Sequence, residues 1–318
     1  MTAPLTAPPP PAPRPPAVPQ TFVDRVSVLA ADIKLSHSVF ALPWAILATF
    51  MAAAKTSPAG LPRVGQIVLI VACMVLARTA AMSANRLFDA DLDRDNPRTA
   101  RRAVPSGRLS KAFVTAAVLA CAFAFVGVTA LFGVVYANWI PLAAGVPILA
   151  FICGYPFLKR FSRFCHYYLG ASLALAPICA WVAIAGRIDR EPLWMAAAVL
   201  CWTAGFDIIY ACQDYENDKA AGLYSVPSTV GIRNALWAAR GTHVGCWACL
   251  LQLGLASPLL STAYFVAIGV TAVLLIVEHA IVRPTDLSKV NLAFFTLNGV
   301  ISLLIGTAGL FDTLRHVH

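Results

Sequence analysis

Long runs of apolar residues dominate the chain and alternate with shorter polar connections. The runs at 112–134 and 263–282 are typical. A helix of about 20 apolar residues spans the roughly 30 Å hydrocarbon core of a bilayer. It also satisfies its own backbone hydrogen bonds, as lipid requires. The pattern predicts an all-α, polytopic membrane protein with nine spans, over about 37–55, 65–84, 112–134, 137–154, 166–186, 193–211, 236–256, 262–282 and 290–311.

The first 20 residues differ from the rest because they are rich in proline and contain no apolar run. Without such a run the segment is not a secretory signal. Proline-rich composition favours extended, unpacked chain. We therefore expect a disordered tail over residues 1–20 and a single transmembrane domain over residues 21–318.

Composition and charge agree with a protein that lies in the lipid bilayer. The 318 residues are 59% hydrophobic and only 12% charged, whereas soluble domains carry about 25% charged residues. The formal net charge is +9. Lys and Arg are concentrated in the connections after the second, fourth, sixth and eighth spans, and such connections face the cytoplasm. We therefore expect no nucleic-acid partner, a cytoplasmic N-terminus and an external C-terminus.

The acidic residues are concentrated in two places. Of the 15 acidic residues, eight lie in two short segments: Asp89, Asp91, Asp93 and Asp95, then Asp207, Asp214, Glu216 and Asp218. Both segments follow spans with the same predicted orientation. Acids at membrane helix ends are costly unless they are paired or ligated. A solvated loop explains one such cluster, but two clusters on one side of the membrane favour a functional site.

Spacing within the two segments places carboxylates in rows. Asn85, Asp89 and Asp93 are spaced i, i+4 and i+8, and the second row has i, i+7 and i+11 spacing from Asp207. On a helix, residues at these intervals share a face. Carboxylates suit Mg²⁺, which commonly completes its shell with substrate phosphates. Nearby Arg and Lys side chains bind phosphate oxygens, so the pattern indicates a magnesium–diphosphate site.

At these residues the chain resembles the UbiA superfamily of intramembrane prenyltransferases, over about residues 25–311. Two acidic motifs carry the resemblance, NxxxDxxxD and DxxYxxxDxxxD, matched by Asn85, Asp89, Asp93, Asp207, Tyr210, Asp214 and Asp218. Three further stretches, RTxxRPLPSG, YPxxKR and GxxS, are matched by Arg98, Thr99, Arg102, Pro105, Ser106, Gly107, Tyr155, Pro156, Lys159, Arg160, Gly222 and Ser225. Ala103 and Val226 replace a usual Pro and Thr.

The resemblance implies nine helices around a central cavity, with a cytoplasmic cap and an opening to lipid. It implies that Mg²⁺ is held by Asn85, Asp89, Asp93, Asp214 and Asp218. Diphosphate would contact Arg98, Arg102, Lys159 and Arg160, and the reacting centre would lie near Asp207 and Tyr210. His37 is a weaker candidate for contact with the acceptor, because a hydrogen-bonded structural histidine is the commoner case.

The implied activity is transfer of a polyprenyl group from a polyprenyl diphosphate to an aromatic acid, for ubiquinone or menaquinone synthesis. The segments 34–45 and 206–231 are most similar to 4-hydroxybenzoate polyprenyltransferases and to the branch that makes menaquinone through futalosine. A hydroxybenzoate and 1,4-dihydroxy-6-naphthoate both remain open as acceptors. The expected location is a bacterial inner membrane, with a cytoplasmic active site.

Two other classes of protein also use acidic residues in membranes. A phosphotransferase with a nucleotide-linked donor would show one compact motif with an early DG and AR pair, which the sequence lacks. A cation transporter would place its carboxylates near the bilayer midplane, whereas these lie at span ends. Both alternatives predict different substrates and are testable.

Overall fold

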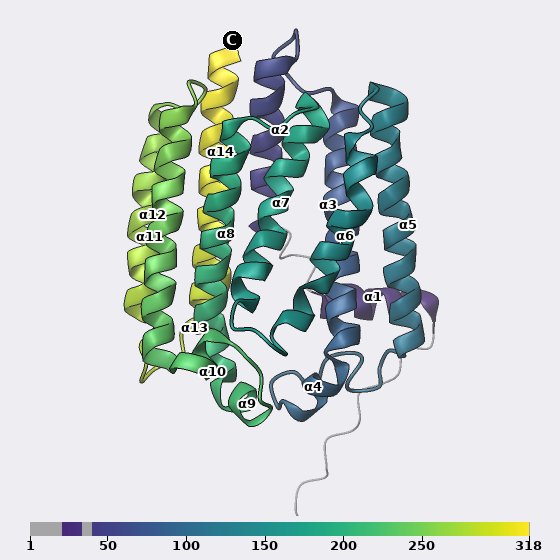
Figure 1. Ribbon diagram of the computed structural model, residues 1–318, viewed down its shortest axis with the longest axis vertical. Coiled ribbons are helices and arrows are strands. Elements are labelled where there is room, and N and C mark those ends of the chain that lie inside the picture. The colour runs from purple at the N-terminus through teal and green to yellow at the C-terminus, as the bar shows by residue number, and fades with distance from the viewer. Residues whose placement is uncertain (1–20, 34–39, 318) are drawn as a thin grey trace, which may run out of the picture.

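The computed structural model describes residues 21–33 and 40–317, and the regular secondary structure of this part of the chain is helical apart from one isolated bridge between Arg283 and Asp286. The proline-rich tail and His37 lie outside the described residues. The long helices run side by side and short elements gather at one end (Figure 1). The long helices are α2 Leu42–Thr56, α3 Val64–Phe88, α5 Lys111–Tyr136, α6 Ile140–Leu158, α7 Cys165–Ala185, α8 Arg190–Ala211, α11 Ile232–Ala256, α12 Thr262–Ile281 and α14 Asn298–Val317.

A helix lies at each predicted span, but the count of nine membrane crossings is not confirmed. Within the described ranges, seven helices are long and apolar enough to cross a membrane. α2 is shorter, with 15 residues. α11 is long enough, but it carries Arg233, Arg240 and His243 in its N-terminal half. The all-helical class is therefore confirmed, and nine crossings stay a prediction.

Short elements form the end of the bundle at which both acidic rows lie (Figure 1). They are α4 Ala90–Asp95, the 3₁₀ turn Cys212–Asp214, α9 Tyr215–Ala220, α10 Val226–Val230 and α13 Val290–Leu292, which precedes the π-helical turn Ala293–Leu297. α1 Phe22–Asp32 runs across the bundle axis near α3 and α5. The C-terminus lies at the opposite end.

A close approach of α7 to α8 fixes part of the site. A Cβ atom on Gly170 would lie 2.4 Å from the backbone oxygen of Leu200, so only glycine allows this approach. One turn from Gly170, His166 meets Asp207. Trp44, Trp181 and Trp202 are fully buried in the main apolar core. Tight packing of this kind holds polar side chains in place.

Candidate active site

The first acidic row lies where α3 ends. Asp89 is both the C-cap of α3 and the N-cap of α4, so the row is not carried by one continuous helix. Backbone hydrogen bonds from Asp89 N to Asn85 O (3.0 Å) and from Asp93 N to Asp89 O (2.7 Å) nevertheless continue the helical path. Asn85 Nδ2 donates to Asp89 Oδ2 at 2.9 Å. The row therefore persists across the break.

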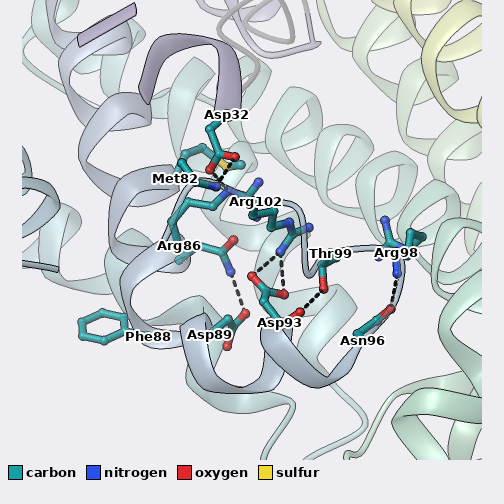
Figure 2. Close-up of polar contacts among 12 residues, drawn as sticks. Asp32, Met82, Arg86, Phe88, Asp89, Asp93, Asn96, Arg98, Thr99 and Arg102 are labelled. Atoms are coloured by element: carbon teal, nitrogen blue, oxygen red, sulfur yellow. Dashed lines mark hydrogen bonds and ion pairs between the residues drawn. The ribbon is translucent and has the colours of Figure 1, made fainter. Parts of the chain in front are cut away.

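Each carboxylate of this row is held by a cation. Lys159 Nζ lies 2.7 Å from Asp89 Oδ2. Arg160 donates to the backbone oxygen of Phe88 and lies 3.5 Å from Asp89 Oδ1. Arg102 Nη1 lies 2.8 and 2.7 Å from the two oxygens of Asp93 (Figure 2). The basic residues expected at the diphosphate thus contact the carboxylates directly.

The second row also departs from a single helix. α8 ends at Ala211, and the chain passes through the 3₁₀ turn that ends at Asp214 before α9 carries Asp218. Asp207 and Tyr210 lie on the last turns of α8. Because the second row follows the C-terminal end of α8, it lies at the same end of the molecule as the first row.

Arg98 joins the two rows. It extends from the connection after α4 and donates from Nε to Asp214 Oδ1 at 2.8 Å, with Nη2 on Oδ2. Its Nη1 donates to the Tyr210 hydroxyl at 3.0 Å, and Asn96 Nδ2 donates to Asp214 at 3.1 Å. Burial lowers the pKa of Arg98, but the hydrogen bond and charge of Asp214 outweigh burial and raise that pKa above its ordinary value. The guanidinium is therefore a permanent cation.

Asp207 has a different partner. His166 Nδ1 lies 2.7 Å from Asp207 Oδ2, and the backbone N–H of Val226 donates to His166 Nε2 at 3.2 Å. Because a backbone N–H only donates, Nε2 has no proton and Nδ1 is the donor to Asp207. The carboxylate of Asp207 is thus held by a histidine, whereas the carboxylates of Asp89, Asp93 and Asp214 pair with Lys or Arg side chains.

The carboxylates are oxygen ligands that suit a divalent cation, but Asp89, Asp93 and Asp214 are each paired with a Lys or Arg side chain. No group of three or more His, Cys, Asp or Glu side chains is close enough to hold a metal within residues 21–33 and 40–317. Asp89 Oδ1 is buried and accepts no hydrogen bond from a described residue, and its ion pair with Arg160 is long, at 3.5 Å. A buried carboxylate oxygen without a hydrogen bond is costly. Oxygen donors of this kind are those that Mg²⁺ prefers.

An apolar cavity of about 500 Å³ begins one turn from the acidic row. It lies among α2, α3, α5, α6 and α7 and is lined mainly by apolar residues such as Phe125, Phe132 and Ile152. Met82 and Tyr155 line its end nearest to Asn85. Because only these helices line it, a cavity central to the whole bundle is not confirmed.

Arg78 is the unexpected polar residue of this cavity. It lines the wall, and its Nε is buried without a hydrogen-bond partner among the described residues. Burying a guanidinium inside a membrane protein is costly, and such residues commonly mark functional sites. A charged residue within an otherwise apolar span is a sequence signal that identifies Arg78 as a candidate.

Sequence reasoning also missed Asn96 and His166. Asn96 binds Asp214, and His166 binds Asp207. Neither belongs to a spaced motif. His166 has one detectable signal, an ionisable side chain at the start of an apolar span. Asn96 has none, because its partner lies 118 positions away.

Comparison with known proteins agrees with this geometry. The model of the UbiA prenyltransferase family matches residues 41–300. A mitochondrial 4-hydroxybenzoate polyprenyltransferase of Caenorhabditis elegans is 31% identical over 223 residues, which cover 69% of this chain. The matched region spans 60% of that relative's length.

Solved structures share the arrangement of helices. A UbiA homologue of Aeropyrum pernix, solved in its apo form, has a TM-score of 0.76 and 29% identity, covering 87% of this chain and 98% of that one. A homologue of Archaeoglobus fulgidus bound to DMAPP and Mg²⁺ has a TM-score of 0.63. It is 19% identical and covers 91% of this chain and 99% of that one, which shows the fold alone. With a family match over most of its length, the chain belongs to the UbiA prenyltransferase family.

Proposed function

We propose that the chain is an integral membrane enzyme that transfers a polyprenyl group from a polyprenyl diphosphate to an aromatic acid. The observation that carries this proposal is the junction of two acidic rows and four cations near one end of an apolar cavity. The rows suit a metal-bound diphosphate, and the cavity suits a hydrocarbon tail. The family match and the similarity to a 4-hydroxybenzoate polyprenyltransferase of Caenorhabditis elegans support it.

The diphosphate is assigned to the basic side chains that now hold the carboxylates. Arg98 and Arg102 offer planar N–H groups that suit phosphate oxygens, and Lys159 offers a point charge. Arg160 lies beside Lys159 and reaches the backbone of Phe88. Asn85, Asp89, Asp93, Asp214 and Asp218 would hold Mg²⁺, which when bound neutralises charge on the diphosphate. The four cations are then free to turn from carboxylate to phosphate oxygens.

The reaction exchanges a carbon–oxygen bond for a carbon–carbon bond. The allylic C–O bond breaks, and its electron pair leaves with the diphosphate. A ring carbon of the acceptor donates a π electron pair to the allylic carbon, and that ring carbon later loses its proton. Cations positioned at the diphosphate stabilise the charge that develops on the leaving group. Apolar walls exclude water that would trap the allylic cation.

The acceptor is assigned to the end of the cavity between Arg78 and the acidic rows. An acid fits there because the Arg78 guanidinium needs an anionic partner, and a carboxylate accepts its N–H groups. Asp207 and Tyr210 lie near the reacting centre and carry no assigned step. 4-Hydroxybenzoate and 1,4-dihydroxy-6-naphthoate are both acids with electron-rich rings. We favour 4-hydroxybenzoate because the Caenorhabditis relative is a 4-hydroxybenzoate polyprenyltransferase. The pathway would then be ubiquinone synthesis, in a bacterial inner membrane with the site facing the cytoplasm.

Product analysis tests the proposal. Membranes containing the chain, Mg²⁺ and geranyl diphosphate are offered each acid, and prenylated product is measured by mass spectrometry. Asp89→Asn and Asp214→Asn should abolish product, with unchanged elution on size exclusion in detergent. Asp91→Asn is the matched control, because Asp91 lies in the same segment with its side chain 74% exposed.

A cation transporter is the alternative of another class. It would give ion uptake by reconstituted vesicles without any prenyl diphosphate, and no prenylated acid. Full activity in Asp89→Asn would also reject the proposed site.

A further inference from the structure

Asp32 lies outside every motif, yet it contacts the framework of the site. It is the last residue of α1, which packs through Leu29 and the following Ile33 against a small apolar cluster that includes Val104 and Val114. This cluster joins α1 to the connection between α4 and α5. The position of Asp32 is thereby fixed relative to that connection.

Asp32 makes two contacts with this framework. Its Oδ1 accepts the backbone N–H of Ala103 at 2.9 Å, and its Oδ2 lies 3.3 Å from Arg86 Nε. The Asp32 and Arg86 side chains are only 7% and 6% exposed. Figure 2 shows Arg86 pointing toward Asp32, with Arg102 beside it. In a buried ion pair of this kind, loss of one partner leaves the other charge uncompensated.

Both contacts are one residue from the proposed site. Arg86 follows Asn85 on α3, and Ala103 follows Arg102, whose guanidinium holds Asp93. Asp32 therefore connects the two ends of the segment that carries the first acidic row, Arg98 and Arg102. None of the site residues themselves binds Asp32.

Charge balance gives this link a consequence for ligand binding. Arg86 lies beside Arg102, whose guanidinium pairs with Asp93 (Figure 2). Arg86 has a second buried nitrogen, Nη1, without a hydrogen-bond partner among the described residues. If Asp32 were neutral, Arg86 would be a buried cation without a balancing anion. It would then be attracted to Asp93, the nearby carboxylate of the first acidic row.

We propose that Asp32 is a positioning residue of the diphosphate site, which acts by balancing Arg86 and by holding the backbone at Ala103. It keeps Arg86 from competing for the carboxylate of Asp93, and it anchors the connection from which Arg98 and Arg102 extend. This inference rests on the proposed function.

The test separates charge from hydrogen bonding. Asp32→Asn keeps an oxygen that accepts from Ala103 but removes the charge. Binding of Mn²⁺, a probe for carboxylate sites, is measured by electron paramagnetic resonance on the purified full chain in detergent. The KM and kcat for geranyl diphosphate are measured alongside. We expect Asp32→Asn to weaken Mn²⁺ binding and raise KM by about tenfold each, the order expected for one unbalanced charge several ångströms away in a partly screened environment.

A rescue variant and a control make the test specific. Asp32→Asn with Arg86→Gln removes both charges and should restore Mn²⁺ binding to near the wild-type value. Asp24→Asn changes an exposed acid of the same helix, whose side-chain hydrogen bonds within the described residues are to Thr21. This variant should change neither Mn²⁺ binding nor KM. Should Asp32→Asn not fold, the double variant still decides, because weak Mn²⁺ binding in it would overturn the proposal.

Other outcomes separate this inference from the proposed function. Wild-type readings in folded Asp32→Asn would overturn the inference alone, as would a double variant that fails to rescue. A purely structural Asp32 would lower the yield of folded protein and leave the KM of the remaining enzyme unchanged. A wild-type chain that neither binds Mn²⁺ nor transfers prenyl groups would overturn both.

Discussion

The guanidinium of Arg98 lies against the carboxylate of Asp214, which is 116 positions away in the chain, with Nε 2.8 Å from Oδ1. This pairing brings the first and second acidic segments to one space. In the proposed substrate complex, diphosphate oxygens would take the place of the Asp214 carboxylate at the N–H groups of Arg98. A mutation of Arg98 therefore tests both its contact with Asp214 and its proposed contact with the diphosphate.

Arg98→Lys keeps the positive charge but loses the planar guanidinium, whose paired N–H groups bind two oxygens at once. We expect the KM for geranyl diphosphate to rise about tenfold or more, since a bidentate charged hydrogen bond contributes roughly 1.5–3 kcal/mol. Arg94→Lys is the control, because Arg94 lies in the same segment and pairs only with the exposed Asp91 in the described chain. Equal KM values in both variants would contradict the role of Arg98.

Asp207→Asn keeps an oxygen that accepts from His166 Nδ1 while removing the negative charge. If that charge stabilises the allylic cation, kcat falls by about 10²–10³, as for loss of one preorganised electrostatic contact. The KM for geranyl diphosphate should stay nearly constant, because Asp207 is not paired with a diphosphate-binding cation. Steady-state kinetics check this, and an unchanged kcat would remove Asp207 from the reacting centre.

Arg78→Gln removes the buried cation from the cavity. We expect the KM for 4-hydroxybenzoate to rise by about 30–100-fold, which corresponds to loss of a charged hydrogen bond of about 2–3 kcal/mol. The KM for geranyl diphosphate should not change. The amide of 4-hydroxybenzoate is the control substrate, since wild type and variant should use it equally poorly. A variant that still prefers the acid over the amide would place the carboxylate elsewhere.

Gly170→Ala would place a Cβ atom 2.4 Å from the backbone oxygen of Leu200. The two helices must then separate, at a cost of about 1–3 kcal/mol for overpacking. We expect a lower melting temperature in detergent and weaker activity, because α7 and α8 carry His166 and Asp207. Gly127→Ala on α5 is the matched control, since a Cβ there meets no atom within 4 Å. A melting temperature that falls equally in both variants would show that helix composition, not the close approach, is responsible.

Much of the site follows from local spacing. The i, i+4, i+8 interval of Asn85, Asp89 and Asp93 predicts a shared face, and the structure retains it across a helix break at Asp89. The spacing of these residues does not predict the helix break at Asp89. The two helices that meet there continue along the same path, so the interval is the same with or without the break. Residues whose partners are distant in sequence, such as Asn96 and His166, could not be predicted in this way.

The sequence by itself determined the helical class, the apolar spans and the two acidic rows. Each of these depends on neighbours within a few turns, where hydrophobicity and helical periodicity act directly. Only the tertiary structure decided that Arg98 holds Asp214, that Asp32 balances Arg86, and that one side of the bundle encloses the cavity with Arg78. These arrangements depend on how the helices pack. The cost of burying Asp32, Arg86 and Asp214 is offset by partners that the local sequence pattern does not reveal.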